Sequence, residues 1–335
     1  MNTMRDVAKR AGVSISTVSH VVNNSRPVSN SARQRVIQAM DELGYKPNAL
    51  ARSLRQQKTN SIGLIVPDSA NPFFAEVARG IEDTSFDQNY SVILCNSDGN
   101  LDKQAIYTNL LIERQVAGIL FVAAGVSTEL VDDLHRRRVP LVIIDREIPN
   151  VSVDTVLTNH YQGGFLATQH LIDLGHLRIA CISAGSELSP SAERVTGYRD
   201  ALETSGIAFD QSLVVRGDFQ YESGYHAAHK LLQKEAPPTA VFASNDLMAV
   251  GCISAITESG MRVPDQISVV GFDDVKLASF SNPPLTTIAQ PKREIGELAT
   301  EILLARIQDL DAPQRFERLE TSLIVRRSTC KLKRN

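Results

Sequence analysis

Apolar residues follow two different patterns along the chain. Up to about residue 45 they recur at helical spacing between turn signals, and from Ser61 onward short apolar runs alternate with helical stretches. Runs of this kind are typical of buried parallel strands. The runs predict two sheets, the first from 62–66, 92–94, 118–122 and 141–144, the second from 179–182, 213–215, 240–242 and 268–270. The expected fold class is α/β, with a small helical domain before two doubly wound sheets.

The first two helical stretches predict a helix-turn-helix. Thr3 and Asp6 have the spacing of a capping box, so a helix should run to about Arg10 and stop at Gly12. Ser14 should cap a second helix, which buries its valines and turns three side chains outward, Ile15, Ser16 and His20. Two short helices joined by such a turn form the DNA-binding motif.

A third helix and a short hinge helix should follow. Ser29 should cap the third helix, whose apolar side chains would close the small core: Val36, Ile37, Met40 and Leu43. Asn48 can cap a hinge helix over 49–55, which is too short to persist alone in water. The expected organisation is a helix-turn-helix domain over 1–47, a hinge over 48–60 and a core over 61–335.

Basic charge is concentrated near the start of the chain. The first sixty residues hold ten Lys and Arg against three acids, whereas the remainder holds 25 against 35. A surface that binds nucleic-acid phosphates requires such a segregation. A merely solvated charged face is the alternative, and the helix-turn-helix pattern makes it less favoured.

The composition of the chain limits what can be expected of its localisation, metal binding and disulfides. The chain has 335 residues, 43% of them hydrophobic, and no apolar segment long enough for a signal peptide or membrane span, so we expect a cytoplasmic protein with no membrane partner. Its four cysteines lack metal-ligand or disulfide spacing, and Cys95, Cys181 and Cys252 should be small core residues. We expect no metal, no cofactor and no disulfide.

Polar and aromatic side chains follow the predicted strands. Because ligands collect at the carboxyl ends of parallel strands, these residues should meet in a cleft between the two sheets. Aromatic rings stack against the C–H face of a sugar, and planar Arg, Asp, Asn and Gln groups satisfy its hydroxyls. The candidates are Asn71, Phe73, Phe74, Asp145, Arg146, Arg194, Phe219, Asn245, Asp273 and Gln290. Each alone also has a plainer explanation as a core, turn or capping residue.

Two motifs, in the right order and at the right separation, resemble those of the LacI/GalR family of bacterial transcription regulators. The first comprises Asp6-Val7-Ala8, Ala11-Gly12-Val13-Ser14, Thr17-Val18-Ser19 and Val22-Asn23, and the second is Ala51-Arg52-Ser53-Leu54. The resemblance covers nearly the whole chain, and extends to ribose-operon and purine repressors. It implies a two-lobed core like that of periplasmic sugar-binding proteins, with three crossings between the lobes. The first lobe would then span about 61–158 and 291–318, the second about 159–290 and 319–330.

The resemblance also implies how DNA is bound. Base edges in the major groove would be contacted by Ile15, Ser16 and His20, and phosphates by Thr3, Arg10, Thr17 and Asn23. In the hinge helix, Ala51, Arg52 and Leu54 would lie at the minor groove, with Leu54 wedged into a base step. A symmetric pair of such units implies a homodimer on a palindromic operator.

The effector expected from this resemblance is ribose or a related pentose. All the cleft candidates except Asn71 match positions used by ribose-type binders, but Ala123-Ala124 offers no amide where those proteins supply one. A sugar should weaken operator binding. Two alternatives stay open: a purine acting as corepressor, and a catabolite-control regulator with a phosphoprotein partner. An enzyme is not expected, because His135, His160, His170 and His176 lie in no catalytic constellation.

Overall fold

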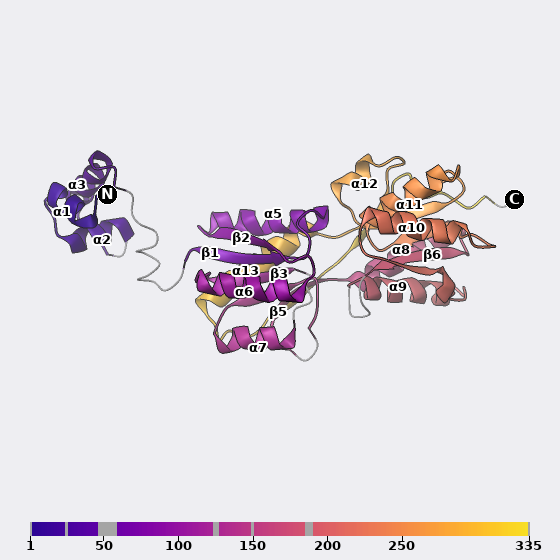
Figure 1. The fold of residues 1–335 in the computed structure, drawn as a ribbon, viewed down its shortest axis with the longest axis horizontal. Helices are drawn as coiled ribbons and strands as arrows, with labels where there is room; N and C mark the ends of the chain where they lie inside the picture. Colours follow the sequence, from indigo (N-terminus) through magenta and orange to yellow (C-terminus); the bar gives the residue numbers. More distant parts are fainter. Residues whose placement is uncertain are drawn as a thin grey trace. The chain divides into compact units, whose positions relative to one another are not determined.

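The computed structural model describes residues 2–23, 26–45, 59–122, 127–148, 151–184 and 190–333. The chain divides into two compact units, residues 1–59 and 60–335 (Figure 1), and each is described by itself. The predicted hinge helix, with Ala51, Arg52 and Leu54, lies outside the described residues, and so do Ala123 and Ala124.

The N-terminal unit contains the three predicted helices, α1 (Met4–Ala11), α2 (Ile15–Asn23) and α3 (Asn30–Glu42). The capping box is confirmed, since the Asp6 amide donates to the Thr3 hydroxyl and the Thr3 amide donates to the Asp6 carboxylate. Gly12 ends α1 in the left-handed conformation, at φ 64°. The Ser14 hydroxyl accepts from the Thr17 amide at 3.0 Å, as a cap of α2 should.

The small core of this unit differs from the prediction at one position. It is built from Val7, Ala8, Ala11, Val18, Val21, Val36 and Ala39. Ile37 was expected inside but is 48% exposed. The buried face of α3 runs through Ala32, Val36 and Ala39, and Ile37 is rotated about 100° from Val36 around the helix axis.

The first lobe is a parallel six-stranded sheet with helices on both faces. Its strands lie in the order β11 (Phe316–Leu319), β5 (Asp154–Thr158), β4 (Leu141–Ile144), β3 (Gly118–Val122), β1 (Ser61–Val66) and β2 (Ser91–Asn96). One face packs against α5 (Pro72–Asp87) and α13 (Lys292–Gln308). The other packs against α6 (Leu101–Glu113) and α7 (Thr128–Arg136) (Figure 1).

The second lobe repeats this architecture. Its strands lie in the order β12 (Ser322–Ile324), β10 (Thr286–Ala289), β9 (Ser268–Asp273), β8 (Ala240–Ala243), β6 (Ile179–Ala184) and β7 (Val214–Gly217). All pairs are parallel except β10 with β12. The helices are α8 (His160–Asp173), α9 (Pro190–Thr204), α10 (Tyr221–Leu232), α11 (Asp246–Glu258), α12 (Lys276–Phe280) and the 3-10 turn η1 (Gln211–Leu213).

The chain crosses between the lobes three times. It leaves the first sheet after β5, returns after β10 to form α13, and leaves again after β11 to form β12. The last helix, α13, therefore lies in the first lobe, and the last strand, β12, lies in the second. Strands β5, β10 and β11 were not predicted, and β5 begins with a buried aspartate, Asp154.

Three of the four cysteines are core residues. Cys95, Cys181 and Cys252 are buried, as predicted, and burial raises their thiol pKa values, for Cys252 to about 12. Within the described ranges, no helix is long and apolar enough to cross a membrane. The same ranges hold no group of three or more His, Cys, Asp and Glu side chains suited to a metal ion.

Candidate functional site

A cavity of about 410 Å³ lies where the carboxyl ends of the two sheets meet, a volume suited to a small molecule. Nine of the ten predicted ligand-binding residues line it: Asn71, Phe73, Phe74, Asp145, Arg146, Arg194, Phe219, Asn245 and Asp273. The tenth, Gln290, is buried behind the wall and donates to Asp273 at 2.7 Å. The structure therefore brings the predicted residues together around one space.

The start of α5 supplies the aromatic wall. Asn71 caps this helix by accepting a hydrogen bond from the Phe73 amide at 3.0 Å. Phe73 is almost fully buried and packs edge-to-face on Phe74, with ring centroids 5.2 Å apart. Phe74 is the less buried of the two. The side-chain oxygen of Asn71 therefore caps the helix, as expected if Asn71 is a capping residue.

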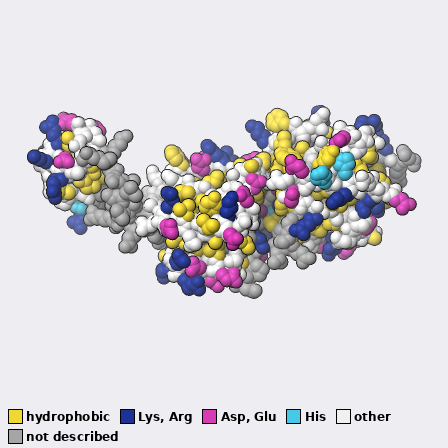
Figure 2. Space-filling view, in the orientation of Figure 1, with side chains coloured by type: hydrophobic (Ala, Val, Ile, Leu, Met, Phe, Trp, Pro, Cys, Tyr) yellow, Lys and Arg dark blue, Asp and Glu magenta, His cyan; other side chains and the backbone are white. Residues whose placement is uncertain are grey.

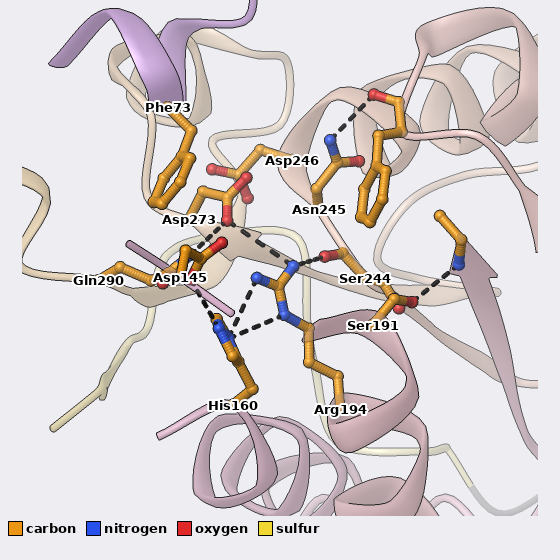
Figure 3. Close-up of polar contacts among 12 residues, drawn as sticks. Phe73, Asp145, His160, Ser191, Arg194, Ser244, Asn245, Asp246, Asp273 and Gln290 are labelled. Atoms are coloured by element: carbon orange, nitrogen blue, oxygen red, sulfur yellow. Dashed lines mark hydrogen bonds and ion pairs between the residues drawn. The ribbon is translucent and has the colours of Figure 1, made fainter. Parts of the chain in front are cut away.

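Asp145 follows β4 and lines the cavity, and its carboxylate lies beside the ring of His160 (Figure 3). Its backbone has φ 65°, an uncommon value for a residue with a side chain. The amide of Asp145 donates to the Val156 carbonyl at 2.8 Å, which fixes the turn after the strand. One carboxylate oxygen, Oδ1, lies 2.7 Å from the His160 ring nitrogen Nε2.

Arg194 projects from α9 with 3% of its surface exposed. Its guanidinium donates to the Ser244 carbonyl and to His160 Nδ1, lies 3.9 Å from Asp273 Oδ1, and stacks 3.8 Å from the centroid of Phe272. Burial lowers the pKa of Arg194, while Asp273 and Asp145 oppose the shift. A fixed, buried guanidinium is suited to bidentate recognition of oxygen atoms.

Asp273 ends β9 at φ 106°, and the chain around it is held by several contacts. The Lys292 ammonium donates to the carbonyls of Asp273 and Asp274 at 2.7 and 2.8 Å. Burial raises the pKa of Asp273 to about 6, against the opposing effects of Arg194 and Gln290. Burial therefore favours the protonated form of Asp273 more than water does.

Asp246 supports this loop from below. Its two oxygens accept from the Thr287 hydroxyl at 2.5 Å and from the Val275 amide at 2.8 Å. Burial, followed by the repulsion from Asp273, raises the pKa of Asp246 well above its ordinary value. Of these two carboxyl groups only Asp273 lines the cavity, and Asp246 is buried behind it.

The second lobe closes the cavity through α10 and α11. Asn245 caps α11 by accepting from the Met248 amide, and its Nδ2 donates to the Phe219 carbonyl at 3.0 Å. Gln220 donates to Asp68 of the first lobe at 3.2 Å, so one hydrogen bond links the two lobes at the cavity edge. The Asn245 side chain is therefore held in place by the start of α11, which it caps, and by its hydrogen bond to the Phe219 carbonyl.

Several lining residues were missed by sequence reasoning. Asp68, Asp98 and Gln220 also line the cavity. Asp68 and Asp98 lie just past the carboxyl ends of β1 and β2, so the rule that selected Asp145 would have selected them as well.

His160 is a further residue that was missed. It was grouped with histidines outside any constellation, yet it is buried at the start of α8 and bonded to both Asp145 and Arg194 (Figure 3). It follows β5, a strand with too little apolar character to be recognised. The only available signal was its position one residue after the helix cap, Asn159.

The predicted DNA-contacting residues that the structure describes belong to α1, its N-cap Thr3, and α2. Ile15 is 44% exposed, and the hydroxyls of Ser16 and Thr17 lie 2.7 and 2.8 Å from that of Ser14. Arg10 forms an exposed ion pair with Glu42 at 2.6 Å. Figure 2 shows Lys and Arg side chains at several points on the surface of this unit.

Two other predicted DNA contacts can be placed only in part. Thr3 is exposed and engaged in its capping box, and the Asn23 side chain lies outside the described residues. Of the predicted base-reading residues of α2, Ile15 and Ser16 are exposed and His20 is half-buried, and their roles in DNA binding stay predictions.

Each of the two units contains a segment that matches a known protein family. Residues 3–48 match the family of bacterial regulatory proteins called the lacI family, and residues 168–329 match a periplasmic binding protein-like domain. The "HTH-type transcriptional repressor PurR" of Photobacterium profundum is 43% identical over 329 residues, 98% of each chain.

Solved structures of transcription regulators are also similar to this chain. A LacI family transcriptional regulator from Enterococcus faecium with bound ribose is 35% identical, with a TM-score of 0.75 over 82% of this chain and 100% of that one. The lac repressor dimer bound to operator and the anti-inducer ONPF is 32% identical, with a TM-score of 0.86 over 98% of this chain and 99% of that one. The chain therefore belongs to the lacI family of bacterial regulatory proteins, as its two motifs predicted, and is a ligand-regulated, DNA-binding transcriptional repressor.

Proposed function

We propose that this repressor binds a palindromic operator as a homodimer in the cytoplasm and is induced by ribose or a closely related pentose. The observation that carries the proposal is the cavity between the lobes, where aromatic rings meet a buried arginine and several carboxylates. The domain boundaries given above and the roles of the individual residues are part of the same proposal.

The polar side chains of the cavity suit a ligand with several hydroxyl groups. Asp145 uses Oδ1 toward His160, and no described residue donates to its Oδ2, which leaves an acceptor for a hydroxyl hydrogen. Arg194 supplies donors at a fixed position, since its guanidinium is held by Ser244 and His160. Donors and acceptors set side by side match hydroxyl groups, each of which donates once and accepts.

The aromatic side chains suit the other surface of a sugar ring. Phe73 and Phe74 come from the first lobe and Phe219 from the second, and all three line the cavity. A pentose presents apolar C–H faces above and below its ring, which aromatic rings can cover while the rim of hydroxyls meets the polar groups. A ligand bound in this way touches both lobes.

A purine corepressor is the second candidate, because relatives 40–43% identical over nearly the whole chain carry the name PurR. The cavity chemistry favours the sugar. Asp68, Asp98, Asp145, Asp218 and Asp273 all line it, and a purine base has few N–H donors to offer so many acceptors. The ribose-bound solved relative also favours the sugar.

Regulation follows from a ligand that contacts both lobes. Effector binding would favour one arrangement of the lobes over another, and a ligand shifts an equilibrium only by its difference in affinity for the two states. In the proposal, the arrangement favoured by the sugar prevents two hinge helices from pairing and inserting Leu54 into the operator. Ser16 and His20 would read bases, and Arg10 would contact phosphate.

The effector is tested by calorimetric titration of the full-length chain with ribose, other pentoses, hypoxanthine and guanine. Saturable binding of ribose or another pentose with no purine response is the expected result. Arg194→Ala should abolish that binding, whereas Arg178→Ala should leave it unchanged, because Arg178 binds the Ala236 carbonyl outside the cavity. Binding of a purine alone, or of neither class, would contradict the proposed effector.

A further inference from the structure

His160 joins the two lobes beneath the cavity. Its Nε2 lies 2.7 Å from Asp145 Oδ1 of the first lobe, and its Nδ1 lies 3.2 and 3.4 Å from Arg194 Nη2 and Nε of the second (Figure 3). The ring is 2% exposed. Both partners line the cavity, whereas His160 itself does not.

The two contacts determine which ring nitrogen carries the proton. A guanidinium only donates, so Nδ1 of His160 must accept from Arg194 and cannot itself hold a hydrogen. Nε2 then holds the hydrogen and donates it to Asp145. A doubly protonated ring would set an N–H against the guanidinium donors. The pair with Asp145 is therefore a hydrogen bond from a neutral ring to a carboxylate.

The position of His160 in the chain makes its hydrogen bond to Asp145 sensitive to the angle between the two lobes. It stands two residues after β5, where the chain leaves the first sheet, and at the first position of α8 in the second lobe. Asp145 belongs to the first lobe and Arg194 to α9 of the second. A change in the angle between the lobes must therefore alter the distance from His160 to Asp145.

We propose that His160 is the positioning residue that holds Asp145 and Arg194 in one geometry, so that effector affinity depends on its two hydrogen bonds. The inference rests on the proposed function, in which these two side chains hold the effector. A fixed geometry before binding lowers the cost of ordering the site when the ligand arrives. His160 thus acts through its neighbours and does not touch the ligand.

Another histidine provides the contrast with a purely structural role. His176 is equally buried, and its ring is bonded to the hydroxyls of Thr239 and Ser268 and to the Cys330 carbonyl. None of these partners lines the cavity. His176 therefore serves as the matched control, since its loss removes buried hydrogen bonds of the same kind without touching the site.

The first test measures effector affinity in the full-length chain by calorimetric titration with ribose. His160→Leu fills similar space but makes no hydrogen bond, and should weaken ribose binding roughly ten- to a hundredfold. His160→Gln has a donor and an acceptor at its tip and should recover much of the affinity, because it can again donate to Asp145. His176→Leu should lower the melting temperature but leave the affinity within about twofold of wild type.

Two results would overturn the inference. Wild-type affinity in His160→Leu would show that the site needs no such link, and equal losses in His160→Leu and His176→Leu would show a general packing effect. A wild-type chain that binds no ribose refutes the proposed effector instead.

The second test needs no effector. Ring ¹⁵N spectra of histidine-labelled full-length protein, with the His160 signals assigned by their absence in His160→Gln, should show the neutral Nε2–H tautomer. A doubly protonated ring, or the Nδ1–H tautomer, would overturn the inference whatever the effector is.

Discussion

Gly164 of α8 packs directly against the backbone of Arg194 in α9, so that a Cβ at position 164 would lie 2.1 Å from the Arg194 carbonyl oxygen. A similar contact lies one turn away, where a Cβ at Gly197 would lie 2.1 Å from the Tyr161 carbonyl oxygen. The absence of side chains at both positions allows the two helices to approach closely. This approach brings His160 within hydrogen-bonding distance of Arg194.

Gly164→Ala should therefore affect both stability and effector binding. The new methyl group must push α8 and α9 apart, at a cost of about 1–3 kcal/mol in the free energy of unfolding. The same displacement moves Arg194, so effector affinity should fall by roughly tenfold or more. Urea denaturation followed by circular dichroism, together with calorimetric titration, measures the two effects.

A matched control exists in the first lobe. A Cβ at Gly80 would lie 2.3 Å from the Arg293 carbonyl oxygen between α5 and α13, and neither residue lines the cavity. Gly80→Ala should destabilise the core to a similar extent without a specific effect on effector affinity. Equal losses of affinity in the two variants would contradict the link between helix approach and the site.

Effector affinity should depend on the ionisation of Asp273. Burial raises the pKa of this carboxyl from 3.8 to about 6, and bound hydroxyl groups favour the charged form. Affinity should be highest above about pH 6 and should fall as the pH drops through about 6. Protons should be released on binding near pH 6, which titrations in buffers of different ionisation enthalpy can measure.

The free energy of unfolding of the unliganded chain should depend on the ionisation of Asp273 in the opposite direction, and should decrease as the pH rises. Because the folded-state pKa is raised, the favourable contribution of this group is present below pH 3.8 and is lost as the pH rises through about 6. Asp273→Asn should bind the effector more weakly and remove both dependences. A pH response of affinity that persists in this variant would assign it to another group.

The ion pair between Arg306 and Asp154 should stabilise the first lobe. Arg306 donates to both Asp154 oxygens at 2.8 and 2.9 Å, and Asp154 is almost fully buried. Arg306→Met leaves a buried carboxylate without its partner and should cost about 3–5 kcal/mol in the free energy of unfolding. Adding Asp154→Asn should recover part of the loss. A change below about 1 kcal/mol in chemical denaturation of Arg306→Met would refute this role.

Two substitutions in the N-terminal unit should separate phosphate contacts from base contacts. Arg10→Ala should weaken binding to all DNA sequences alike and reduce the salt dependence of log K by about one. Its exposed pair with Glu42 contributes little to stability, so folding should be unaffected. His20→Ala should instead relax the preference at particular base pairs and leave the salt slope unchanged.

Binding selection from random duplexes, followed by anisotropy titrations at several salt concentrations, measures these effects. A reduced salt slope for His20→Ala, or an altered base preference for Arg10→Ala, would reverse the two assignments.

The apolar strands of the core could be predicted because strands covered on both faces consist of uninterrupted apolar runs. β1, β3, β4 and β8 are of this type, and all their residues but Ser61 are buried. The exposed edge strand β11 has the charged residues Glu317 and Arg318 at its centre. The buried strands β5 and β10 contain threonines, and the Thr287 hydroxyl is bonded to Asp246. Such strands have no apolar run to reveal them.

The cavity could be predicted to a similar extent and for a related reason. Parallel strands end at the same edge of a sheet, so polar residues after β8 and β9 lie close together in the second lobe, and Asp145 after β4 lies at the corresponding edge of the first sheet. His160 escaped this reasoning because it follows β5, which was itself not predicted. Its role depends on the approach of α8 to α9 and on the φ of Asp145, neither of which a single sequence reveals.

The most direct test of the account measures operator affinity with and without effector. The full-length chain would first select its own operator from random DNA duplexes, and anisotropy titrations at fixed salt would follow, with saturating ribose or hypoxanthine and with wild type or Arg194→Ala. We predict that ribose weakens operator binding of wild type by roughly five- to a hundredfold, but not of Arg194→Ala. Unchanged affinity with ribose, or tighter binding with hypoxanthine, would contradict a sugar-induced repressor and favour a protein partner or a purine corepressor respectively.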